Sequence, residues 1–586
     1  MLDQAPAFLN VESSLTGRRW IGPAPDVRRQ AEALAQRLDL PPALCAVLAR
    51  LGVAADDADG FLEPQLRDLL PDPRSLKDMD IAAERLLTAV AQRQKIAVFA
   101  DYDVDGGTSA ALLVTWLRAF GLSATLYVPD RIDEGYGPNE AAMAQLALAH
   151  DLIICVDCGT LSHAPIQAAS GADVVVLDHH LGGETLPPAM AVVNPNRQDE
   201  SGDLGHLCAA AVVFLLLVEA GRRLRERGET GPDLLALLDL VGLATVADVA
   251  PLVGVNRAFV RQGLKVMAQR RRVGLTALAD AARLDTAPTS YHLGFVLGPR
   301  INAGGRIGAA DLGARLLSTE DPHEAAALAE RLEALNAERR EIEASVRHAA
   351  LDQAAARPAG GLAWAAGEGW HPGVVGIVAS RLKETTNRPS LVIGFDGNAG
   401  KGSGRSVAGI DLGAAVQRLA TEGLIEKGGG HKMAVGLSLS RAQLEPAMAR
   451  LDELLTRQGA ASLGPRDLRC DGVLMPAAAT RELIVALDSA GPFGASAPAP
   501  RFALPSVTVR QARRVGEAHL KLAVSGGPGE RPLDAICFGA FEGPMGPALE
   551  KSVGAAVHIA GRLDLNQWQG RSVPQLYLED ASLEIG

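Results

Sequence analysis

The sequence predicts an α/β protein with a parallel β-sheet, a second α/β unit and a small β-barrel near its end. Three observations indicate this fold class. Short apolar runs alternate with helical segments from residue 96, a long charged helix follows at 323–356, and apolar residues alternate with polar ones over 465–586. At 586 residues the chain is long enough for about four domains.

Composition places the chain among ordinary globular proteins. Apolar residues make up 48% and charged residues 22%, which excludes a disordered, collagenous or disulfide-stapled chain. Six cysteines are too few for a disulfide framework and fit a reducing compartment. The first residues show no signal-peptide pattern, and the longest apolar run, 207–218, is shorter than the ~20 residues that span a bilayer. We therefore expect a cytoplasmic protein with no membrane partner.

The net charge of -12 argues against a protein that coats nucleic acid without specificity. It does not exclude an enzyme of nucleic acids, because bound divalent ions and a local basic groove can supply a positive field. Aromatic residues make up only 4%, so contacts with single strands would depend on the phosphate backbone more than on stacked bases.

The predicted elements follow one another in a regular order. Residues 1–75 form a helical lead-in, whose end is marked by Pro64, Pro71 and Pro73. After it, strands alternate with helices at a spacing that indicates a parallel sheet with helices on both faces. The predicted strands are 96–100, 125–128, 152–156 and 174–177, and the predicted helices are 108–120, 139–150 and 163–170.

Helices dominate from Leu207 to Leu317, and 323–356 reads as one long charged helix. That helix is either a surface helix or a strut between two domains. A second α/β unit begins after 357–361 and is rich in glycine over 397–436. The final alternating section predicts a small β-barrel or sandwich.

The motif D-Y-D-V-D-G, Asp101 to Gly106, directly follows the first strand of the predicted sheet. Three carboxylates at alternate positions repel one another, and a bound cation would relieve that repulsion. The alternative is an acidic surface turn that caps the next helix. The loop alone does not decide between these two interpretations.

Two further strands end in similar residues, because Asp157 follows the third strand and Asp178-His179-His180 follows the fourth. The carboxyl ends of parallel strands meet at one edge, where ligands bind. Asp248, in an apolar stretch, is a fourth candidate. Each residue alone could be a capping Asp or a core His, but together they favour a metal site. Carboxylates with imidazoles and no thiolate suit Mn²⁺ or Mg²⁺, and the oxygens suffice for two ions that activate water and clamp a phosphoryl group.

Three later motifs combine glycine with a cation, and each could be a turn with a solvated arginine. Together they favour a phosphate-bearing polymer as ligand, because glycine lets backbone N–H groups approach an anion while arginine and serine complete the cradle. The motifs are P-R-I-N-A-G-G-R at 299–306, K-G-S-G-R-S at 401–406 and K-G-G-G-H-K at 427–432.

These motifs carry a resemblance. D-Y-D-V-D-G followed by Asp178-His179-His180 resembles the DHH phosphoesterase superfamily. G-W-H-P-G-V-V-G-I-V-A-S-R-L from Gly369 and G-G-G-H at 428–431 resemble its DHHA1 partner domain. With P-D-R-I-D-E-G-Y-G from Pro129 and L-N-A-E-R-R-E-I-E from Leu335, the full order is similar to the bacterial single-strand exonucleases of that superfamily, from about residue 45 to the C-terminus.

The resemblance implies a fold in which the active site lies between a DHH and a DHHA1 domain, and an OB-fold holds single-stranded DNA. It implies 5′→3′ hydrolysis of single-stranded DNA to 5′ mononucleotides with two Mn²⁺ or Mg²⁺ ions, in recombination and repair. A helicase and a single-strand-binding protein are the implied partners. The implied boundaries are a lead-in at 1–75, DHH at 76–320, a connecting helix at 321–357, DHHA1 at 358–460 and the OB-fold at 461–586.

The resemblance also implies roles for individual residues. The catalytic residues would be His180 and Asp157. The metal ligands would be Asp103, Asp105, Asp157, His179 and Asp248, with Asp101 as a further candidate. The substrate would be bound by Arg131, Arg300, Asn302, Arg306, Ser403, Arg405 and His431.

Two departures and two alternatives qualify the resemblance. In the motif at 299–306, Gly304 stands where the family usually has Ala, and this position is not a proposed metal ligand. Where the family usually shows P-F-G-x-G-N-P, this chain has P-F-G-A-S-A-P at 492–498, which concerns the junction before the OB-fold rather than the chemistry. A DHH phosphodiesterase for short RNA or cyclic dinucleotides is one alternative, but the final β domain and the length argue against it. An inactive DNA-binding scaffold is the other, but the set of metal ligands is complete.

Overall fold

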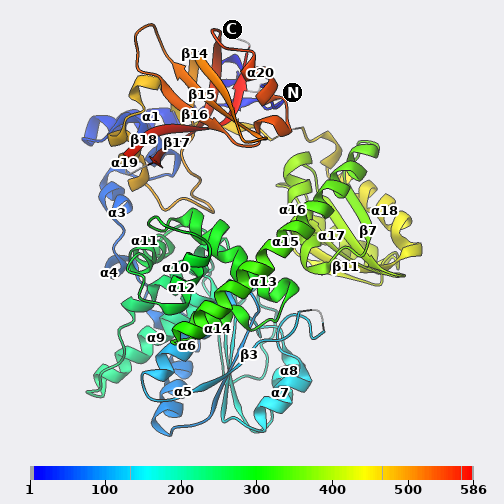
Figure 1. Cartoon of the computed structure of the whole chain (residues 1–586). Helices are drawn as coiled ribbons and strands as arrows, with labels where there is room; N and C mark the ends of the chain where they lie inside the picture. Colours follow the sequence, from blue (N-terminus) through cyan, green and yellow to red (C-terminus); the bar gives the residue numbers. More distant parts are fainter. Residues whose placement is uncertain (1–5, 132, 465, 569–570, 584–586) are drawn as a thin grey trace. The chain divides into compact units, whose positions relative to one another are not determined.

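The computed structural model describes residues 6–131, 133–464, 466–568 and 571–583. The chain forms two compact units (Figure 1). The larger unit contains Pro71–Ala250 and Gln262–Gly464, and the smaller one contains the described parts of Met1–Leu70, Pro251–Arg261 and Pro465–Gly586. Within the described ranges, no helix combines the length and the apolar character that crossing a bilayer requires.

The larger unit begins with a sheet of five parallel strands in the order β3-β2-β4-β5-β6. Its central strands are apolar throughout and fully buried, as expected for a parallel sheet covered on both faces. The four predicted strands are confirmed, and the short β6 was not predicted. The strands are β2 (Ile96–Ala100), β3 (Ala124–Tyr127), β4 (Leu152–Val156), β5 (Asp173–Leu177) and β6 (Ala191–Val193).

Helices cover both faces of this sheet, which confirms the predicted parallel α/β architecture. On one face, Met143 and Ile166 of the two shortest helices share an apolar core with Phe99 and Ile153 of the strands. The helices of this part are α5 (Met79–Ala91), α6 (Val104–Arg118), α7 (Glu140–Ala147), α8 (His163–Ala168) and α9 (Ala209–Glu226).

A helical region follows and leads into the long helix α15 (Pro322–Ala356), which is capped by the Asp321 carboxylate accepting from the N–H of His323. α15 packs on α12, α13 and α14, and Val346 and Ala350 near its other end join the core of the second α/β domain. These contacts favour the strut over the surface helix. The preceding helices are α10 (Leu238–Ala247), α11 (Val255–Met267), α12 (Val273–Ala281), the π-helix η5 (His292–Leu297), α13 (Gly298–Ile307) and α14 (Leu312–Ser318).

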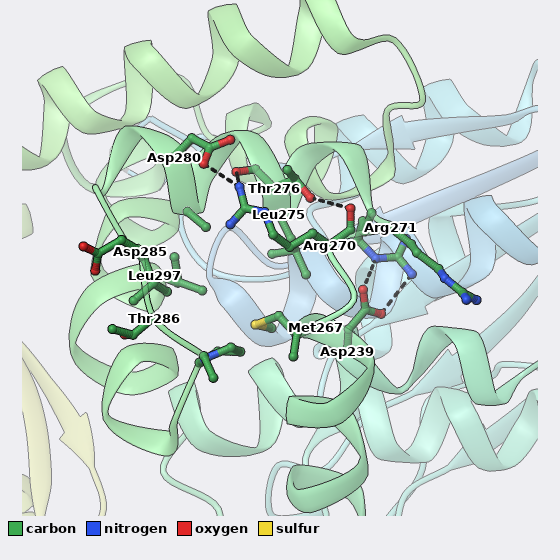
Figure 2. A pocket seen from close by; sticks show the side chains of 16 residues that line it. Asp239, Met267, Arg270, Arg271, Leu275, Thr276, Asp280, Asp285, Thr286 and Leu297 are labelled. Carbon is green, nitrogen blue, oxygen red and sulfur yellow. Dashed lines mark hydrogen bonds and ion pairs between the residues drawn. The ribbon is translucent and has the colours of Figure 1, made fainter. Parts of the chain in front are cut away.

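A pocket of about 540 Å³ lies within this helical region (Figure 2). Two of the arginines that line it already have acidic partners. Arg272 donates to Asp239 over 2.8 and 3.0 Å, and Arg270 pairs with Asp280. None of the site residues predicted from the sequence lines this pocket.

The second α/β domain contains a mixed sheet in the order β10-β11-β9-β8-β7. The glycine-rich stretch forms strands here. β9 is paired on both sides, so its glycine N–H groups belong to the sheet, and the prediction that they cradle a phosphate is wrong. The elements are β7 (Ala363–Glu368), α16 (Pro372–Thr386), β8 (Ser390–Asp396), β9 (Ala399–Arg405), α17 (Leu412–Thr421), β10 (Lys427–Gly430), β11 (Ala434–Ser440) and α18 (Leu444–Arg457).

The smaller unit contains a closed barrel of five strands, because β14 pairs with both β15 and β17. Closure decides in favour of the barrel over the sandwich, and the helix α20 (Met545–Glu550) lies between the third and fourth strands, as in an OB-fold. The strands are β14 (Phe502–Val515), β15 (His519–Ser525), β16 (Leu533–Cys537), β17 (Ala556–Trp568) and β18 (Arg571–Ser582), and the short β13 (Gly472–Val473) pairs with β14.

The predicted N-terminal helices exist, but they share one apolar core with the barrel. Leu44 and Leu48 of α2 belong to the same cluster as Phe502 and Ile559 of the barrel strands. The lead-in therefore folds as part of the barrel unit. Its elements are β1 (Trp20–Ile21), α1 (Pro25–Arg37), α2 (Pro42–Arg50), α3 (Ala58–Leu62) and α4 (Leu66–Leu69), and β12 (Leu468–Arg469) and α19 (Arg481–Ser489) complete the unit.

The divergent motif at 492–498 also lies in this unit, where it receives the segment Pro251–Arg261. The N–H of Leu252 donates to the Ala495 carbonyl over 2.9 Å, and Gly494 bridges to Ala497. Within this unit, the motif at 492–498 is thus a loop that contacts the segment Pro251–Arg261.

Asp580 fixes the N-terminal segment to the last barrel strand. Its buried carboxylate accepts from the Trp20 indole N–H and from the Thr16 hydroxyl, both over 2.9 Å. Trp20 also pairs through its backbone with Leu468, so the segment is held by a strand pairing and by a charged hydrogen-bond acceptor.

Asp580→Ala should lower the free energy of unfolding of the barrel unit by about 2–3 kcal/mol, because it leaves buried donors without an acceptor. Urea denaturation followed by tryptophan fluorescence measures this. The neighbouring Glu579 pairs with Arg501 and Arg562 in half-exposed ion pairs, so Glu579→Ala should cost less than about 1 kcal/mol. Equal losses for both variants would contradict the anchoring role of Asp580.

Candidate metal centre

The acidic loop after β2 turns directly into α6. Asp103 caps this helix by accepting from the N–H groups of Asp105 and Gly106, so the helix begins at Val104, four residues before the predicted start. A Cβ at Gly106 would lie 2.4 Å from the Asp101 carbonyl oxygen, and only glycine fits there. The loop is therefore both a helix cap and a tight gathering of carboxylates.

Asp105 is buried beneath this loop, with 1% of its surface exposed. Its two oxygens accept from the N–H groups of Ala209 and Ala210 over 2.7 and 2.8 Å, at the beginning of α9. The positive end of that helix dipole stabilises the carboxylate charge. The chain thus holds Asp105 in place from two helix N-termini.

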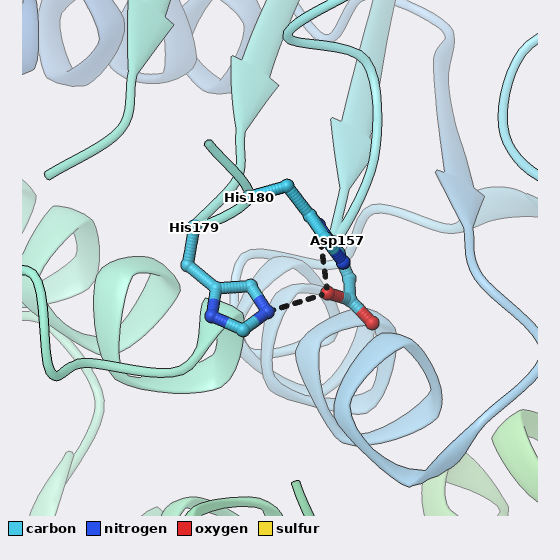
Figure 3. Close-up of side chains that lie close together, drawn as sticks. All are labelled: Asp157, His179 and His180. Atoms are coloured by element: carbon cyan, nitrogen blue, oxygen red, sulfur yellow. Dashed lines mark ion pairs between the residues drawn. The ribbon is translucent and has the colours of Figure 1, made fainter. Parts of the chain in front are cut away.

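Asp157 follows β4 with a φ of 60°, a left-handed conformation that costs energy for a residue other than glycine. Its Oδ1 lies 3.3 Å from Nε2 of His179 and 3.8 Å from Nδ1 of His180, and both histidines follow the neighbouring strand β5 (Figure 3). The strained backbone directs the carboxylate toward the two imidazoles.

His179 connects this pair to two more acids. Its Nε2 lies 3.7 Å from Asp105, and its Nδ1 lies 3.8 Å from Asp248, which caps the C-terminus of α10. Three overlapping groups of ligand atoms result, each within 4.8 Å: Asp157, His179 and His180; Asp105, His179 and Asp248; and Asp101, Asp103 and Asp157. The structure brings every predicted ligand, including Asp101, to one place.

Positive charge compensates the acids of this centre only in part: among the described residues, His180 and Arg131 act on Asp101, and His180 acts on Asp248. Burial and the neighbouring Asp103 raise the pKa of Asp101, and burial and Asp105 raise that of Asp157. Burial, followed by Asp105 and Asp103, raises the pKa of Asp248 to about 8. Oδ1 of Asp101 and Oδ1 of Asp157 are buried and accept no hydrogen bond from any residue that the structure describes. Hard divalent cations such as Mn²⁺ and Mg²⁺ fit this set of oxygens and imidazoles.

Asp178 is a residue whose role the sequence did not reveal. Its buried carboxylate accepts from the N–H of Thr160, from the N–H groups of both histidines and, over 2.8 Å, from Nδ1 of His180. Burial alone would raise its pKa, but the hydrogen bonds from His180 and Thr160 lower it. Burial lowers the pKa of the His180 imidazole, but the hydrogen bond and the charge of Asp178 raise it, and the result is a pKa of about 9.

Three more residues outside the predicted site position the histidines. Asn194 donates to the His180 carbonyl over 2.8 Å, and Asn196 donates to that of His179 over 2.6 Å. The Tyr136 hydroxyl lies 2.9 Å from the Asp157 carbonyl and 3.0 Å from Nδ1 of His180. Two short sequences could have indicated these residues, because no strand pattern explains them. They are N-P-N after β6 and G-Y-G in the motif from Pro129.

Three of the predicted substrate arginines lie together. Arg306 donates to the Gly373 carbonyl over 3.0 Å, and Arg131 lies over the Tyr102 ring. Burial and the neighbouring Arg131 lower the pKa of Arg306 to about 10. The same two causes lower the pKa of Arg405. In the described part of the chain, none of the three forms an ion pair with a carboxylate. This cluster of Arg131, Arg306 and Arg405, the arginine cluster, is suited to bind an anion.

Ser403 belongs beside this cluster, because its hydroxyl accepts from Arg405 over 3.1 Å. Gly376 of α16 makes room for both side chains, since a Cβ there would lie 3.1 Å from the hydroxyl and 3.3 Å from the guanidinium. Arg405 and Ser403 are thus packed in one orientation.

The structure places the other predicted substrate residues differently. Arg300 pairs with Glu333 of α15, and Asn302 accepts from the N–H of Val104, which ties α13 to the acidic loop. His431 is exposed just after β10. Arg300 and Asn302 therefore hold the scaffold around the centre.

Asp157→Ala should weaken Mn²⁺ binding by at least tenfold, because Asp157 contributes to two of the three ligand groups. Calorimetric titration of chelator-treated protein measures this, together with the rise in Tm on adding Mn²⁺. Asp173→Asn is the matched control, since Asp173 begins β5 and pairs with Arg85 away from the centre. Unchanged Mn²⁺ affinity in the Asp157 variant would exclude this centre as the metal site.

Known proteins share these features. Family models match the chain at residues 95–245 (DHH family, N-terminal domain), 359–457 (DHHA1 domain) and 470–580 (RecJ OB domain). Single-stranded-DNA-specific exonuclease RecJ of Escherichia coli is 38% identical over 564 residues, which cover 92% of this chain and 96% of that protein. RecJ of Dickeya dadantii is 40% identical over 566 residues, with the same coverage.

Solved structures agree with this relationship. Thermus thermophilus RecJ in complex with Mn²⁺ superposes with a TM-score of 0.78 at 31% identity, covering 96% of this chain and 79% of that one. The same protein has been solved in complex with Mg²⁺, with a TM-score of 0.72. The ordered motifs, the barrel and these relatives lead to one conclusion: the chain belongs to the RecJ family of single-stranded-DNA-specific exonucleases.

Proposed function

We propose that this protein is a single-stranded-DNA-specific exonuclease that uses Mn²⁺ or Mg²⁺ and degrades its substrate from the 5′ end to 5′ mononucleotides. One observation carries the proposal: Asp157 and His179 each belong to two overlapping groups of ligand atoms, which is an arrangement for two cations in one centre. The names of the relatives and the metals in their structures support the same activity.

The chemistry follows from the residues around the centre. Divalent ions bound there would activate a water and neutralise phosphoryl oxygens. The carboxylates and His179 would hold them, with Asp105 fixed by the start of α9. Asp178 and Tyr136 fix His180 beside Asp157, where it would meet a phosphodiester bound at the centre and hold a proton for the reaction.

The polarity of the proposed reaction depends on the arginine cluster. A 5′-terminal phosphate carries more charge than an internal phosphodiester, and Arg405 with Ser403 offers a planar fork and a hydroxyl to its oxygens. A terminus bound there would present a nearby phosphodiester to the metal centre. Each cut leaves a new 5′ phosphate, which can bind in the same place.

We also propose the boundaries 1–75, 76–320, 321–357, 358–460 and 461–586 for the successive parts, with the barrel as the part that holds single-stranded DNA. A helicase that supplies single strands and a single-strand-binding protein are proposed as partners, in recombination and repair, on the resemblance alone.

The activity should appear as release of 5′ mononucleotides from 5′-phosphorylated single-stranded DNA with Mn²⁺, and a blunt duplex should be degraded far more slowly. Product analysis on 5′- and 3′-labelled strands measures this, and Asp157→Ala should be inactive. Cleavage of a dinucleotide in preference to a long strand would instead support a small-substrate phosphodiesterase. Binding without any cleavage would support a scaffold.

Arg405→Ala should slow degradation of 5′-phosphorylated DNA roughly 10–100-fold, because it removes a charged hydrogen-bond donor worth about 1.5–3 kcal/mol. Degradation of 5′-hydroxyl DNA should slow by less than about threefold, and Mn²⁺ affinity should not change. The rate ratio on the two substrates is the measurement.

The matched control is Arg418→Ala, because Arg418 lies on the exposed side of α17 in the same domain and pairs with Glu422. It should leave both rates as in the wild type. If Arg405→Ala slowed both substrates by one factor, Arg405 would be a general backbone contact and the account of end selection would be wrong.

A further inference from the structure

Val249 has a backbone conformation that β-branched residues avoid. Its φ is 60°, in the left-handed region that favours glycine. Among the residues that the structure describes, it is the only β-branched one with a positive φ. This conformation ends α10, because the N–H of Val249 donates to the Val246 carbonyl over 3.2 Å and that of Ala250 donates to the Thr245 carbonyl over 3.1 Å. The two hydrogen bonds form a Schellman motif, whose left-handed residue is usually glycine.

Packing gives little return for this strain. Val249 is 69% exposed, so most of its side chain lies in solvent rather than in the core. Glycine would close the same turn without the steric penalty. Residues held in a strained conformation cluster at binding and catalytic sites, where the strain serves the function. The exposed and strained valine therefore points to a contact with a ligand.

The metal centre is next to this side chain. Val249 directly follows Asp248, whose carboxylate belongs to the ligand group with Asp105 and His179. Asp157 is a second residue of the centre with a left-handed backbone, and it is itself a candidate ligand. Val249 has no atom that could bind a metal ion. What it offers to a substrate is an apolar surface beside the place where a phosphate would bind.

An apolar surface at this place distinguishes sugars by their hydroxyl groups, because a phosphodiester carries a sugar on each side. Deoxyribose has only hydrogen atoms at C2′ and packs against methyl groups. Ribose has a hydroxyl at C2′, which would lose its water there without gaining a hydrogen-bond partner. The 2′-hydroxyl is the group by which a protein tells RNA from DNA.

We propose that Val249 contacts the C2′ side of a sugar next to the scissile phosphate and thereby selects DNA over RNA. The inference rests on the proposed function and adds the residue that reads the sugar. The left-handed turn fixes the two methyl groups relative to the metal centre, because the same helix end carries Asp248. The strain is thus the cost of holding an apolar side chain beside a ligand.

The test compares Val249→Gly with the wild type on DNA strands that carry one ribonucleotide at successive positions from the 5′ end. In the wild type, one position should slow degradation by roughly 10–100-fold relative to the all-DNA strand. Val249→Gly should reduce this ribonucleotide penalty to less than about threefold, and its kcat/KM on the all-DNA strand should stay within about threefold. Because glycine relieves the strain, the Tm should rise by about 2–4 °C, so a folding defect cannot produce the result.

Val249→Thr separates the chemistry of the side chain from its shape. Threonine keeps the β-branch and with it the strain, so the Tm should stay close to that of the wild type. Its hydroxyl can pair with a 2′-hydroxyl, and the ribonucleotide penalty should therefore fall by at least roughly threefold. A 2′-fluoro sugar at the same position has no hydroxyl to donate, and on that strand Val249→Thr should gain nothing over the wild type.

Arg283→Gly is the matched control for the backbone. Arg283 also has a positive φ, 55°, and is exposed at the end of α12. The same pair of hydrogen bonds fixes it, from its own N–H to the Asp280 carbonyl and from the N–H of Leu284 to the Ala279 carbonyl. The variant should raise the Tm as Val249→Gly does and should leave the ribonucleotide penalty as in the wild type.

Three results would overturn the proposal while the wild type still degrades single-stranded DNA. The first is a wild type that shows no ribonucleotide penalty at any position. The second is a penalty that Val249→Gly leaves unchanged, which would show that the side chain does not meet the sugar. The third is an equal loss of rate on all strands, which would make Val249 a support of Asp248 alone. A wild type that does not degrade single-stranded DNA would instead contradict the proposed function.

Discussion

Repulsion among buried carboxylates at one edge of a parallel sheet is the constraint on which the rest of the larger unit depends. Asp101 and Asp157 directly follow strands β2 and β4, and burial raises the pKa of both. Holding these groups together costs backbone energy at Asp157, which has a left-handed conformation. The Asp105 carboxylate is stabilised instead by backbone N–H groups at the start of α9. Asp178 completes the arrangement by accepting hydrogen bonds from the backbone N–H groups of His179 and His180 and from Nδ1 of His180.

The protein leaves excess charge of both signs unpaired in the same unit. In the described part of the chain, His180 and Arg131 offset the charge of the acids only in part, and none of Arg131, Arg306 and Arg405 in the arginine cluster forms an ion pair with a carboxylate. A metal ion would satisfy the first group and a phosphate the second, and a metal-bound phosphodiester would satisfy both. By contrast, the charge of Arg300, which holds the scaffold, is neutralised by an ion pair with Glu333. Unpaired charge therefore separates the residues that we propose as ligand contacts from those that hold the fold.

Local patterns in the sequence were sufficient for the four predicted strands of the parallel sheet. They also indicated which acids and histidines lie together, because Asp101, Asp157 and Asp178-His179-His180 directly follow strands of that sheet. They failed where tertiary packing decides. The glycines of β9 resemble a loop in composition, but Ile393 and Leu437 fill the space beside Gly402 and make a strand. Asn194 and Tyr136 reach the histidines from positions 14 and 44 residues away from His180, which no spacing rule encodes.

The pairing of Trp20 with Asp580 joins residues that are 560 positions apart. A ribosome delivers the first helices long before the strands that cover them, so Leu44 and Leu48 stay without their barrel partners while the larger unit is made. Contacts of such sequence separation form late and slowly. The core that these helices share with the barrel thus cannot be complete before strand β18 has been made.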